Sequence, residues 1–570
     1  MLFLGISEDL FDAGAVVTDG RDVIFAANEE RYTRRKNEGG FPHRSVAAAL
    51  QWAGASLADV DAVAVSGIMT PPLPVRLFPR LHDWSYAVKR ELRGSFLRGL
   101  ADGVTFLTPM SHTASDGISR RWVRAVLPRV ARRRLRGLRP GVPVSFADHH
   151  GCHAAAACAL SGFTEALCVT ADGMGDGLSL TVSRHREGAD LERLWSASSR
   201  DSFGLFYEAL TEAFGFVPCR DEGKLTGLAA LGDPARVGEP PPFARGADGR
   251  LRYTGPLGGR GVAWARRLLE RHSREDVSAW AQSLLESFVL EITREWLART
   301  GLRRLAVAGG VFANVKLNQR LHELEGVDGL FVLPNMGDGG LSLGAVALAG
   351  GLAPQRLKDV FFGESYGDAE LERAMAAGGL AWERPENIAE TVAGHVAGGR
   401  IVARFDGRME WGPRALGNRS ILAPAGDPAV HDRLNDHLKR SEFMPFAPAV
   451  ADGELDRFVL GADKARHAAE FMTVCFSCAP KMGELYPSVV HADGTARAQC
   501  VRRDANPGFH AILEALGRRT GGAVVLNTSF NMHEEPIVRT PEEAVSAFLK
   551  ARLDYLAMGP FLAGFPGGKR

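Results

Sequence analysis

The chain has 570 residues, 45% of them hydrophobic and 24% charged, which is long enough for two to four domains and a large core. Its formal net charge of +1 gives no overall electrostatic case for nucleic acid as a partner. No apolar run is long enough for a membrane span and no signal peptide is recognisable, and the seven scattered cysteines fit a reducing compartment, so the expected location is the cytoplasm.

The start of the chain predicts a strand followed by a β-hairpin whose turn is Asp19-Gly20. The same pattern recurs where Asp172-Gly173 separates strand-like runs at 166–170 and 178–182. Two such hairpins that feed α/β segments predict an internally duplicated fold of the actin and sugar-kinase type. In that fold a nucleotide lies between two related halves.

Residues 75–140 look like an insertion in this fold. The stretch from Ser119 to Pro140 contains nine arginines and no acidic residue, and its apolar residues recur at helical spacing. A solvated basic helix is the default interpretation. The alternative is a helix that contacts an acidic partner or an anionic surface.

Two histidines and two aspartates form the most informative pattern. His149 and His153 are four residues apart in an alanine-rich run, so a helix would point both rings the same way. Asp172 and Asp338 each lie in a glycine-rich turn that lets the backbone come close to a metal or phosphate. Together they predict a site for a divalent metal such as iron or manganese. The alternatives are a structural histidine pair and ordinary hairpin turns.

A strand at 305–308 leads into Gly309-Gly310, a turn that lets the backbone approach a nucleotide but is a weak signal alone. Composition then shifts between about 352 and 386, where we place a domain boundary. The predicted domains are 1–363 and 364–570, the second being a smaller α/β unit.

The second domain carries basic and amide side chains among glycine and proline, away from any periodic salt-bridge pattern. Guanidinium groups bind phosphate oxygens with two parallel hydrogen bonds, so this half predicts a site for ATP and an acyl phosphate. The alternative is a set of interdomain or surface salt bridges. The candidate residues are Arg408, Arg414, Arg419, Lys439, Arg497, Asn527 and Ser529.

These motifs in this order resemble the O-carbamoyltransferases of antibiotic and nodulation-factor biosynthesis, over nearly the whole chain apart from 75–140. The blocks that carry the resemblance are Glu29 to Lys36, His149-His150-x-x-His153, Asp221 to Lys224, Gly309 to Asn318, Gly337-Asp338, Gly412 to Gly417, Asp493 to Arg497 and Asn527 to Asn531.

The resemblance implies two modules. The first is similar to the actin-like subunit that makes threonylcarbamoyl-adenosine, and the second, a twisted-sheet α+β domain, to threonylcarbamoyl-AMP synthase. The second module would convert carbamoyl phosphate and ATP, with Mg²⁺, into carbamoyl adenylate. The first would transfer the carbamoyl group to a hydroxyl of a small natural product and release AMP.

The resemblance also implies roles for particular residues. His149, His153, Asp172 and Asp338 would bind Fe²⁺ or another divalent metal. The nucleotide in the first domain would be lined by Lys224, Gly309, Gly310, Asn314 and Asn318. In the second site Arg414, Arg419 and Lys439 would be catalytic. Phe11 and Asn37 stand where the family has histidines, which leaves Asp12 as the candidate general base.

Two alternative functions stay open. One is a carbamoyl-adenylate enzyme of the hydrogenase-maturation type, which acts on a protein cysteine. The other is a degenerate nucleotide-binding protein that regulates a true transferase. A homodimer is the default expectation for the assembly.

Overall fold

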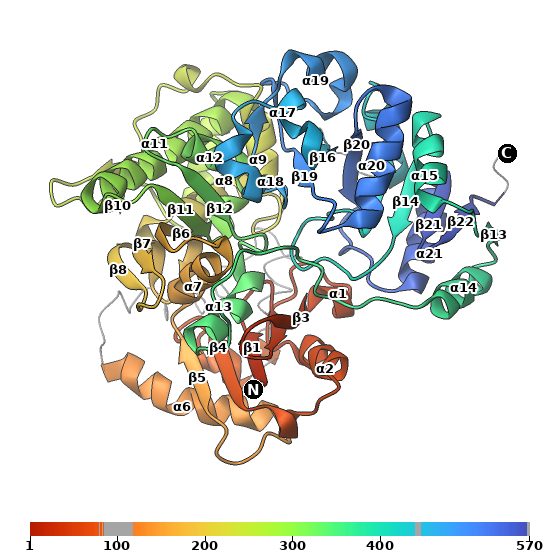
Figure 1. Cartoon of the computed structure of the whole chain (residues 1–570). Coiled ribbons are helices and arrows are strands. Elements are labelled where there is room, and N and C mark those ends of the chain that lie inside the picture. The colour runs from red at the N-terminus through yellow and green to blue at the C-terminus, as the bar shows by residue number, and fades with distance from the viewer. Residues whose placement is uncertain (79, 82–83, 85–117, 439–445, 567–570) are drawn as a thin grey trace. The chain divides into compact units, whose positions relative to one another are not determined.

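The computed structural model describes residues 1–78, 80–81, 84, 118–438 and 446–566 (Figure 1). The chain forms two compact units. Unit 1 contains residues 1–29 and 37–357, and unit 2 contains residues 30–36 and 358–570. The functional boundary at residue 363 stays a prediction, as does the 75–140 insertion, of which 85–117 lies outside the described residues.

Unit 1 contains two five-stranded sheets with the same topology. In each sheet the first three strands along the chain pair antiparallel with one another, and two later strands add in parallel on one side. The central strands β1 (Phe3–Ser7) and β6 (Glu165–Gly175) therefore hold equivalent positions. The first sheet has the order β3 (Val23–Asn28), β2 (Gly14–Thr18), β1 (Phe3–Ser7), β4 (Ala62–Ser66) and β5 (Val144–Ala147). The second has the order β8 (Glu192–Ser198), β7 (Leu178–Arg186), β6 (Glu165–Gly175), β11 (Arg304–Ala308) and β12 (Gly329–Val332). This repeat confirms the predicted duplicated α/β fold of the actin type.

Two short helices join the halves of unit 1. Helix α7 (His149–Ser161) packs on β6 and β11, helix α13 (Leu341–Leu348) packs on β1 and β4, and the two helices pack on each other (Figure 1). Their approach is so close that a Cβ at Gly344 would lie 1.8 Å from the carbonyl oxygen of Cys152. The alanine run of α7 therefore provides small side chains for this crossing as well as helix propensity.

Further helices and a small hairpin complete unit 1. Helix α6 confirms the predicted basic helix, and its buried Leu127 and Val130 face inward while Trp122 is 69% exposed. The helices are α2 (His43–Trp52), α3 (Leu73–Leu77), α6 (Ile118–Arg134), α8 (Phe203–Ala213), α9 (Glu222–Ala229), α10 (Gly259–Leu269), α11 (Arg274–Thr300) and α12 (Val315–His322), and the hairpin is β9 (Phe243–Arg245) with β10 (Leu251–Tyr253). None of the described helices is both long and apolar enough to cross a membrane.

Unit 2 is built on an eight-stranded mixed sheet. Its order is β13 (Trp382–Glu383), β22 (Phe561–Gly564), β21 (Tyr555–Met558), β14 (Val402–Phe405), β15 (Arg419–Ala423), β20 (Val524–Ser529), β16 (Ala447–Ala451) and β19 (Gln499–Val501). A separate ribbon pairs β17 (Phe476–Ser477) with β18 (Thr495–Ala496). The mixed sheet confirms the predicted class of this half.

Helices α15 (Ile388–Ala397) and α20 (Pro507–Thr520) pack together over the sheet of unit 2, where Val396, Leu513 and Phe509 enter its apolar core. Helix α1 (Glu30–Thr33) also belongs to this unit, and the Arg31 guanidinium donates to the Gly412 carbonyl at 2.8 Å. The remaining helices are α14 (Asp368–Ala377), α16 (Val430–Leu438), α17 (Leu455–Phe458), α18 (Arg466–Ala469), α19 (Pro480–Leu485) and α21 (Pro541–Ala551).

Candidate functional site

Four predicted side chains come together in unit 1. His149 and His153 lie in the first turns of α7, Asp172 lies in β6, and Asp338 begins the short turn that leads into α13. One ligand atom from each of the four lies within 4.8 Å of all the others. The cluster therefore lies at the junction of the two halves of the duplicated fold.

The spacing of these atoms fits a metal ion. Asp172 Oδ2 is 3.3 Å from His149 Nε2 and 3.0 Å from His153 Nε2, and Asp338 Oδ1 is 3.5 and 3.6 Å from the same two nitrogens. Ligands about 2.1 Å from an ion and at ordinary coordination angles lie about 3.0 to 3.4 Å from each other. Two imidazoles and two carboxylates are donors that suit iron, manganese or zinc.

The backbone around Asp172 departs from regular strand geometry, and this departure places its carboxylate beside the two histidines. The pairing of β6 with β7 shifts register between Ala171 and Gly175, and such a bulge redirects the side chains within it. At Gly175 a Cβ would lie 2.0 Å from His149 Cδ2, so only glycine lets this strand pass so close to the ring. The segment is thus a hairpin that also brings Asp172 into the cluster, so the two alternatives that the sequence left open are compatible.

The cluster has an excess of buried negative charge. Burial, and then the nearby charges of Asp172 and Asp9, raise the pKa of Asp338 well above its usual value. Burial lowers the pKa of His149, but its contacts with Asp172 and Asp9 outweigh this and hold the pKa well above the ordinary value. A bound cation would relieve this repulsion, so the electrostatics as well as the distances fit a divalent metal.

Asp176 is a residue of this region to which the sequence analysis assigned no role. Its fully buried carboxylate accepts backbone N–H bonds from Ile68, Met69 and Thr70 and, at 2.9 Å, from His149. It thereby ties the end of β4 to the first residue of α7. The sequence signal that could have identified it is its position as the second aspartate of the glycine-rich turn that follows Asp172.

The predicted nucleotide turn lies beside the metal cluster. A Cβ at Gly310 would lie 3.1 Å from Asp172 Oδ1, and Gly309, at φ +107°, would clash with the Ala171 carbonyl if it carried a side chain. Asn314 caps α12 and bonds Gln282 and Thr226.

The other two residues predicted to line the nucleotide have protein partners. Asn318 is fully buried, and its amide donates to the Phe312 carbonyl at 2.7 Å. The Nζ atom of Lys224 lies 3.5 Å from Asp221 Oδ1 and over the ring of Phe216. Their roles in nucleotide binding stay predictions.

Asp12, the candidate base, also lies near the cluster. Its Oδ1 accepts a 2.8 Å hydrogen bond from the Asn37 amide. Its Oδ2 is 3.8 Å from the position that a Cβ at Gly337 would occupy, directly before Asp338. Asp12 and Asn37 both have positive φ, so two strained turns meet at this point.

In unit 2 two of the predicted arginines come together. Burial, and then the charge of Arg497, lower the pKa of Arg414 well below its ordinary value. In the part of the chain that the structure describes, no acidic group offsets either charge, and Arg414 Nε has no hydrogen-bond partner. Two buried guanidiniums without an acidic partner among the described residues are typical of a site for an anion, and the anion site stays a prediction.

A buried amide network holds the loop that carries Arg414. Asn527 donates to the Gln499 side chain at 2.8 Å, and Gln499 in turn donates to the Leu416 carbonyl at 2.9 Å. On the same loop Glu410 accepts the backbone N–H of Leu416 at 2.9 Å. Gln499 and Glu410 were not among the predicted residues, since no local motif marks them.

The other predicted residues of unit 2 are placed differently. The guanidinium of Arg419 is fully buried and donates to main-chain carbonyls such as Asp406, and that of Arg408 donates to Gly363. Ser529 donates to the Asn531 side chain at 2.5 Å. Lys439 lies outside the described residues.

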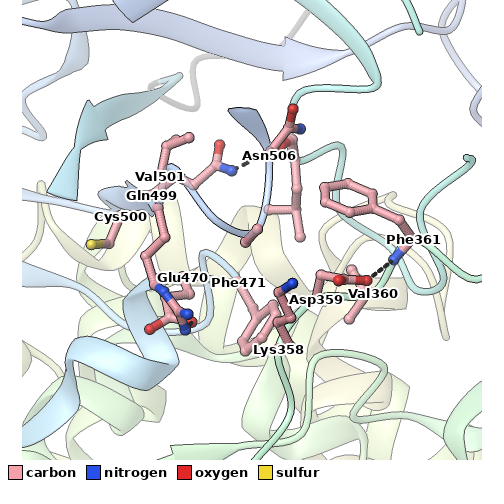
Figure 2. A pocket seen from close by; sticks show the side chains of 13 residues that line it. Lys358, Asp359, Val360, Phe361, Glu470, Phe471, Gln499, Cys500, Val501 and Asn506 are labelled. Atoms are coloured by element: carbon pink, nitrogen blue, oxygen red, sulfur yellow. Dashed lines mark hydrogen bonds and ion pairs between the residues drawn. The ribbon is translucent and has the colours of Figure 1, made fainter. Parts of the chain in front are cut away.

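A pocket adjoins the amide network of unit 2. It is lined by apolar side chains such as Phe361 and Phe471 together with Lys358 and Asn506 (Figure 2). Gln499 also lines it, so the pocket and the loop of Arg414 share one wall.

Both units match known family models. Residues 2–239 and 263–347 match the carbamoyltransferase N-terminus, and residues 393–564 match the carbamoyltransferase C-terminus. The chain is 32% identical to nodulation protein NolNO of Sinorhizobium fredii, over 97% of this chain and 79% of that protein. It is 28% identical to 3'-hydroxymethylcephem-O-carbamoyltransferase of Streptomyces clavuligerus, over 64% of this chain and 69% of that protein.

Among solved structures, full-length HypF in its phosphate- and nucleotide-bound form covers 61% of this chain and 55% of its own, with 13% identity and a TM-score of 0.30. A likeness this slight supports no functional conclusion. The matches to both family models extend over most of the chain and include the metal cluster and the arginine pair. The chain therefore belongs to the carbamoyltransferase family of enzymes.

Proposed function

We propose that this enzyme is an ATP-dependent O-carbamoyltransferase of specialised metabolism. Carbamoyl phosphate and ATP, with Mg²⁺, would give carbamoyl adenylate in the C-terminal domain, 364–570. The N-terminal domain, 1–363, would then transfer the carbamoyl group to a hydroxyl of a small natural product. The matches to both carbamoyltransferase models and the likeness to a cephem O-carbamoyltransferase support this reaction class.

In the first step, water would release phosphate from carbamoyl phosphate, and an oxygen of the resulting carbamate would attack the α-phosphorus of ATP, expelling pyrophosphate. Arg414 and Arg497 would hold the phosphate oxygens, and Lys439 and Ser529 would complete the site. Their work is positioning and the neutralisation of charge as phosphate leaves. Asn527 would support the loop of Arg414 through its hydrogen bond to the Ala415 carbonyl at 3.3 Å. Arg408 and Arg419, which donate to the Gly363 and Asp406 carbonyls, would hold the neighbouring segments in place.

In the second step, the acceptor hydroxyl would attack the carbamoyl carbon, and AMP would leave with the electron pair of the broken C–O bond. Asp12 would take the hydroxyl proton, since its carboxylate lies beside Gly337 and the metal cluster. Gly309 and Gly310 would let the adenylate approach, with Lys224, Asn314 and Asn318 behind them. An iron ion held by His149, His153, Asp172 and Asp338 would supply Lewis-acid polarisation of the carbamoyl carbonyl.

The observation that carries the proposal is the pair Arg414 and Arg497, which have no acidic partner among the residues of unit 2 that the structure describes. A structural arginine is normally compensated by carboxylates or carbonyls, as Arg419 is by main-chain oxygens. Arg414 and Arg497 instead oppose each other, which costs folding free energy unless an anion binds between them.

Variants of the two clusters test the proposal by separating the half-reactions. Arg414→Ala should lower pyrophosphate release from ATP and carbamoyl phosphate by about 100-fold or more, because it removes a charge that the leaving phosphate needs. His149→Ala should leave pyrophosphate release intact while metal content and carbamoyl transfer to a panel of hydroxylated metabolites are lost.

Arg433→Ala is the matched control for Arg414→Ala. Arg433 is a half-exposed arginine of unit 2 whose charge is already paired with Asp427 at 2.8 Å, so its loss should leave both half-reactions unchanged. Pyrophosphate release that is equal in Arg414→Ala and Arg433→Ala would exclude the assignment of the second site. Full metal content in His149→Ala would exclude the assignment of the metal centre.

A further inference from the structure

Asp9 is a buried carboxylate next to the metal cluster that no motif marks. It follows β1, and its backbone carbonyl accepts the Gly40 N–H at 2.7 Å in an isolated β-bridge that fixes its position. The residue is 1% exposed. Its Oδ1 accepts the Leu10 backbone N–H at 2.6 Å, whereas its Oδ2 accepts no conventional hydrogen bond within the described chain.

The partner that Asp9 Oδ2 faces is the imidazole of His149. The distance from Oδ2 to His149 Nδ1 is 3.4 Å, and both side chains are almost fully buried. The opposite nitrogen, Nε2, faces Asp172 at 3.3 Å and Asp338 at 3.5 Å. The ring of His149 therefore lies between an outer carboxylate and the proposed metal position.

The second histidine lacks this arrangement. Neither Nδ1 atom makes a hydrogen bond in the described part of the protein, but only that of His149 has a carboxylate within 4.0 Å there. For His153 the ion-pair distances involve Nε2, which is 3.0 Å from Asp172. A carboxylate behind a metal-binding imidazole holds the Nδ1–H tautomer, orients the ring and makes its free nitrogen a stronger ligand. The two histidines are therefore not equivalent.

We propose that Asp9 is a positioning residue for the metal centre, holding His149 with its Nε2 lone pair directed at the ion. The proposal rests on the metal site proposed above. The negative charge of Asp9 also adds to the field that attracts a divalent cation, although Asp9 is not one of the four residues that would bind the ion directly. Asp9 thus acts through His149 and has no contact with the reacting groups.

Metal affinity of the full-length protein tests this role without any substrate. Apoprotein is titrated with Co²⁺, and binding is followed by the visible absorption of the ion and by competition with a chelator. Asp9→Ala should raise the Kd for Co²⁺ by about 10-fold to 100-fold, the usual effect of losing such a carboxylate. Asp9→Asn should raise it less, since an amide oxygen can face Nδ1–H in the same position but carries no charge.

Glu8→Gln is the matched control. Glu8 is the neighbouring buried carboxylate, but it pairs with Arg134 and is not part of the cluster, so the same loss of charge there should leave the Kd unchanged. If both Asp9 variants bind Co²⁺ as tightly as the wild type while His149→Ala loses it, the role of Asp9 is wrong.

Two further outcomes are decisive. If Asp9→Ala fails to fold, the nearly isosteric Asp9→Asn decides by the same measurement. If His149→Ala binds Co²⁺ like the wild type, the metal site itself is wrong, a failure distinct from that of Asp9 and from that of adenylate formation.

Discussion

Loss of the Asp176 carboxylate should disrupt the metal site without removing a ligand. This side chain accepts four backbone N–H groups, at distances of 2.6 to 3.0 Å, from residues 68–70 just after β4 and from His149. Asp176→Ala would leave these four buried donors without an acceptor. The end of β4 and the start of α7 would no longer be held together, and His149 would lose its anchor.

The expected magnitude follows from the number of orphaned donors. A buried donor left without a partner costs about 1 to 3 kcal/mol, so four cost at least about 4 kcal/mol even at the low end of that range. That is a large share of the about 5 to 15 kcal/mol by which proteins are stable. Asp176→Asn should cost less, because its carbonyl oxygen still accepts, while its amide group opposes the His149 N–H.

The assay is thermal and urea unfolding of the variants, read alongside Co²⁺ binding. Asp148→Ala is the control, since Asp148 caps the same helix through one 2.9 Å bond from the Gly151 N–H and otherwise pairs with the partly exposed Arg193. A lost cap of this kind costs about 1 kcal/mol. If Asp176→Ala were no less stable than Asp148→Ala and bound Co²⁺ equally well, Asp176 would not be the anchor described here.

Two other predictions concern packing and pH. Gly344→Val should separate α7 from α13 and weaken both stability and Co²⁺ binding, because even a Cβ would lie 1.8 Å from the Cys152 carbonyl. The control Gly394→Ala, in open space on helix α15, should raise the melting temperature. Equal effects of the two substitutions would refute the close crossing. Burial, with repulsion from Glu208 and Asp221, raises the pKa of Glu222 from 4.5 to about 7. The folded pKa exceeds the unfolded one, so the stability that the protonated carboxyl contributes is full below pH 4.5 and is lost as the pH rises through about 7. Glu222→Gln should flatten this part of the pH–stability curve in urea unfolding, and an unchanged slope would contradict the shift.

The meeting of His149, His153, Asp172 and Asp338 could be predicted because each of these residues carries a local signal. His149 and His153 share a helix face by their spacing, and Asp172 and Asp338 lie in glycine-rich turns. The duplicated sheet could be predicted for the same reason, since each half begins with a hairpin marked by an Asp-Gly turn. These are short-range patterns, which one sequence is able to show.

Asp9, Asp176 and Gln499 could not be assigned roles in the same way. Asp9 contacts a residue 140 positions away, and Gln499 bonds a carbonyl 83 positions away, so their roles exist only in the folded chain. Arg419 shows that a local signal can also fail to reveal a residue's contacts. Its glycine-rich surroundings predicted an anion site, yet its described hydrogen bonds go to main-chain carbonyls, and a sequence does not show which oxygens a guanidinium will meet.

Formation of carbamoyl adenylate tests the central claim most directly. The full-length protein is incubated with ATP, Mg²⁺ and ¹³C-labelled carbamoyl phosphate without an acceptor, and the products are identified by mass spectrometry. We predict labelled carbamoyl adenylate with an equal amount of pyrophosphate, both strongly reduced in Arg414→Ala. Wild-type protein that binds ATP but forms neither product would contradict the proposed reaction.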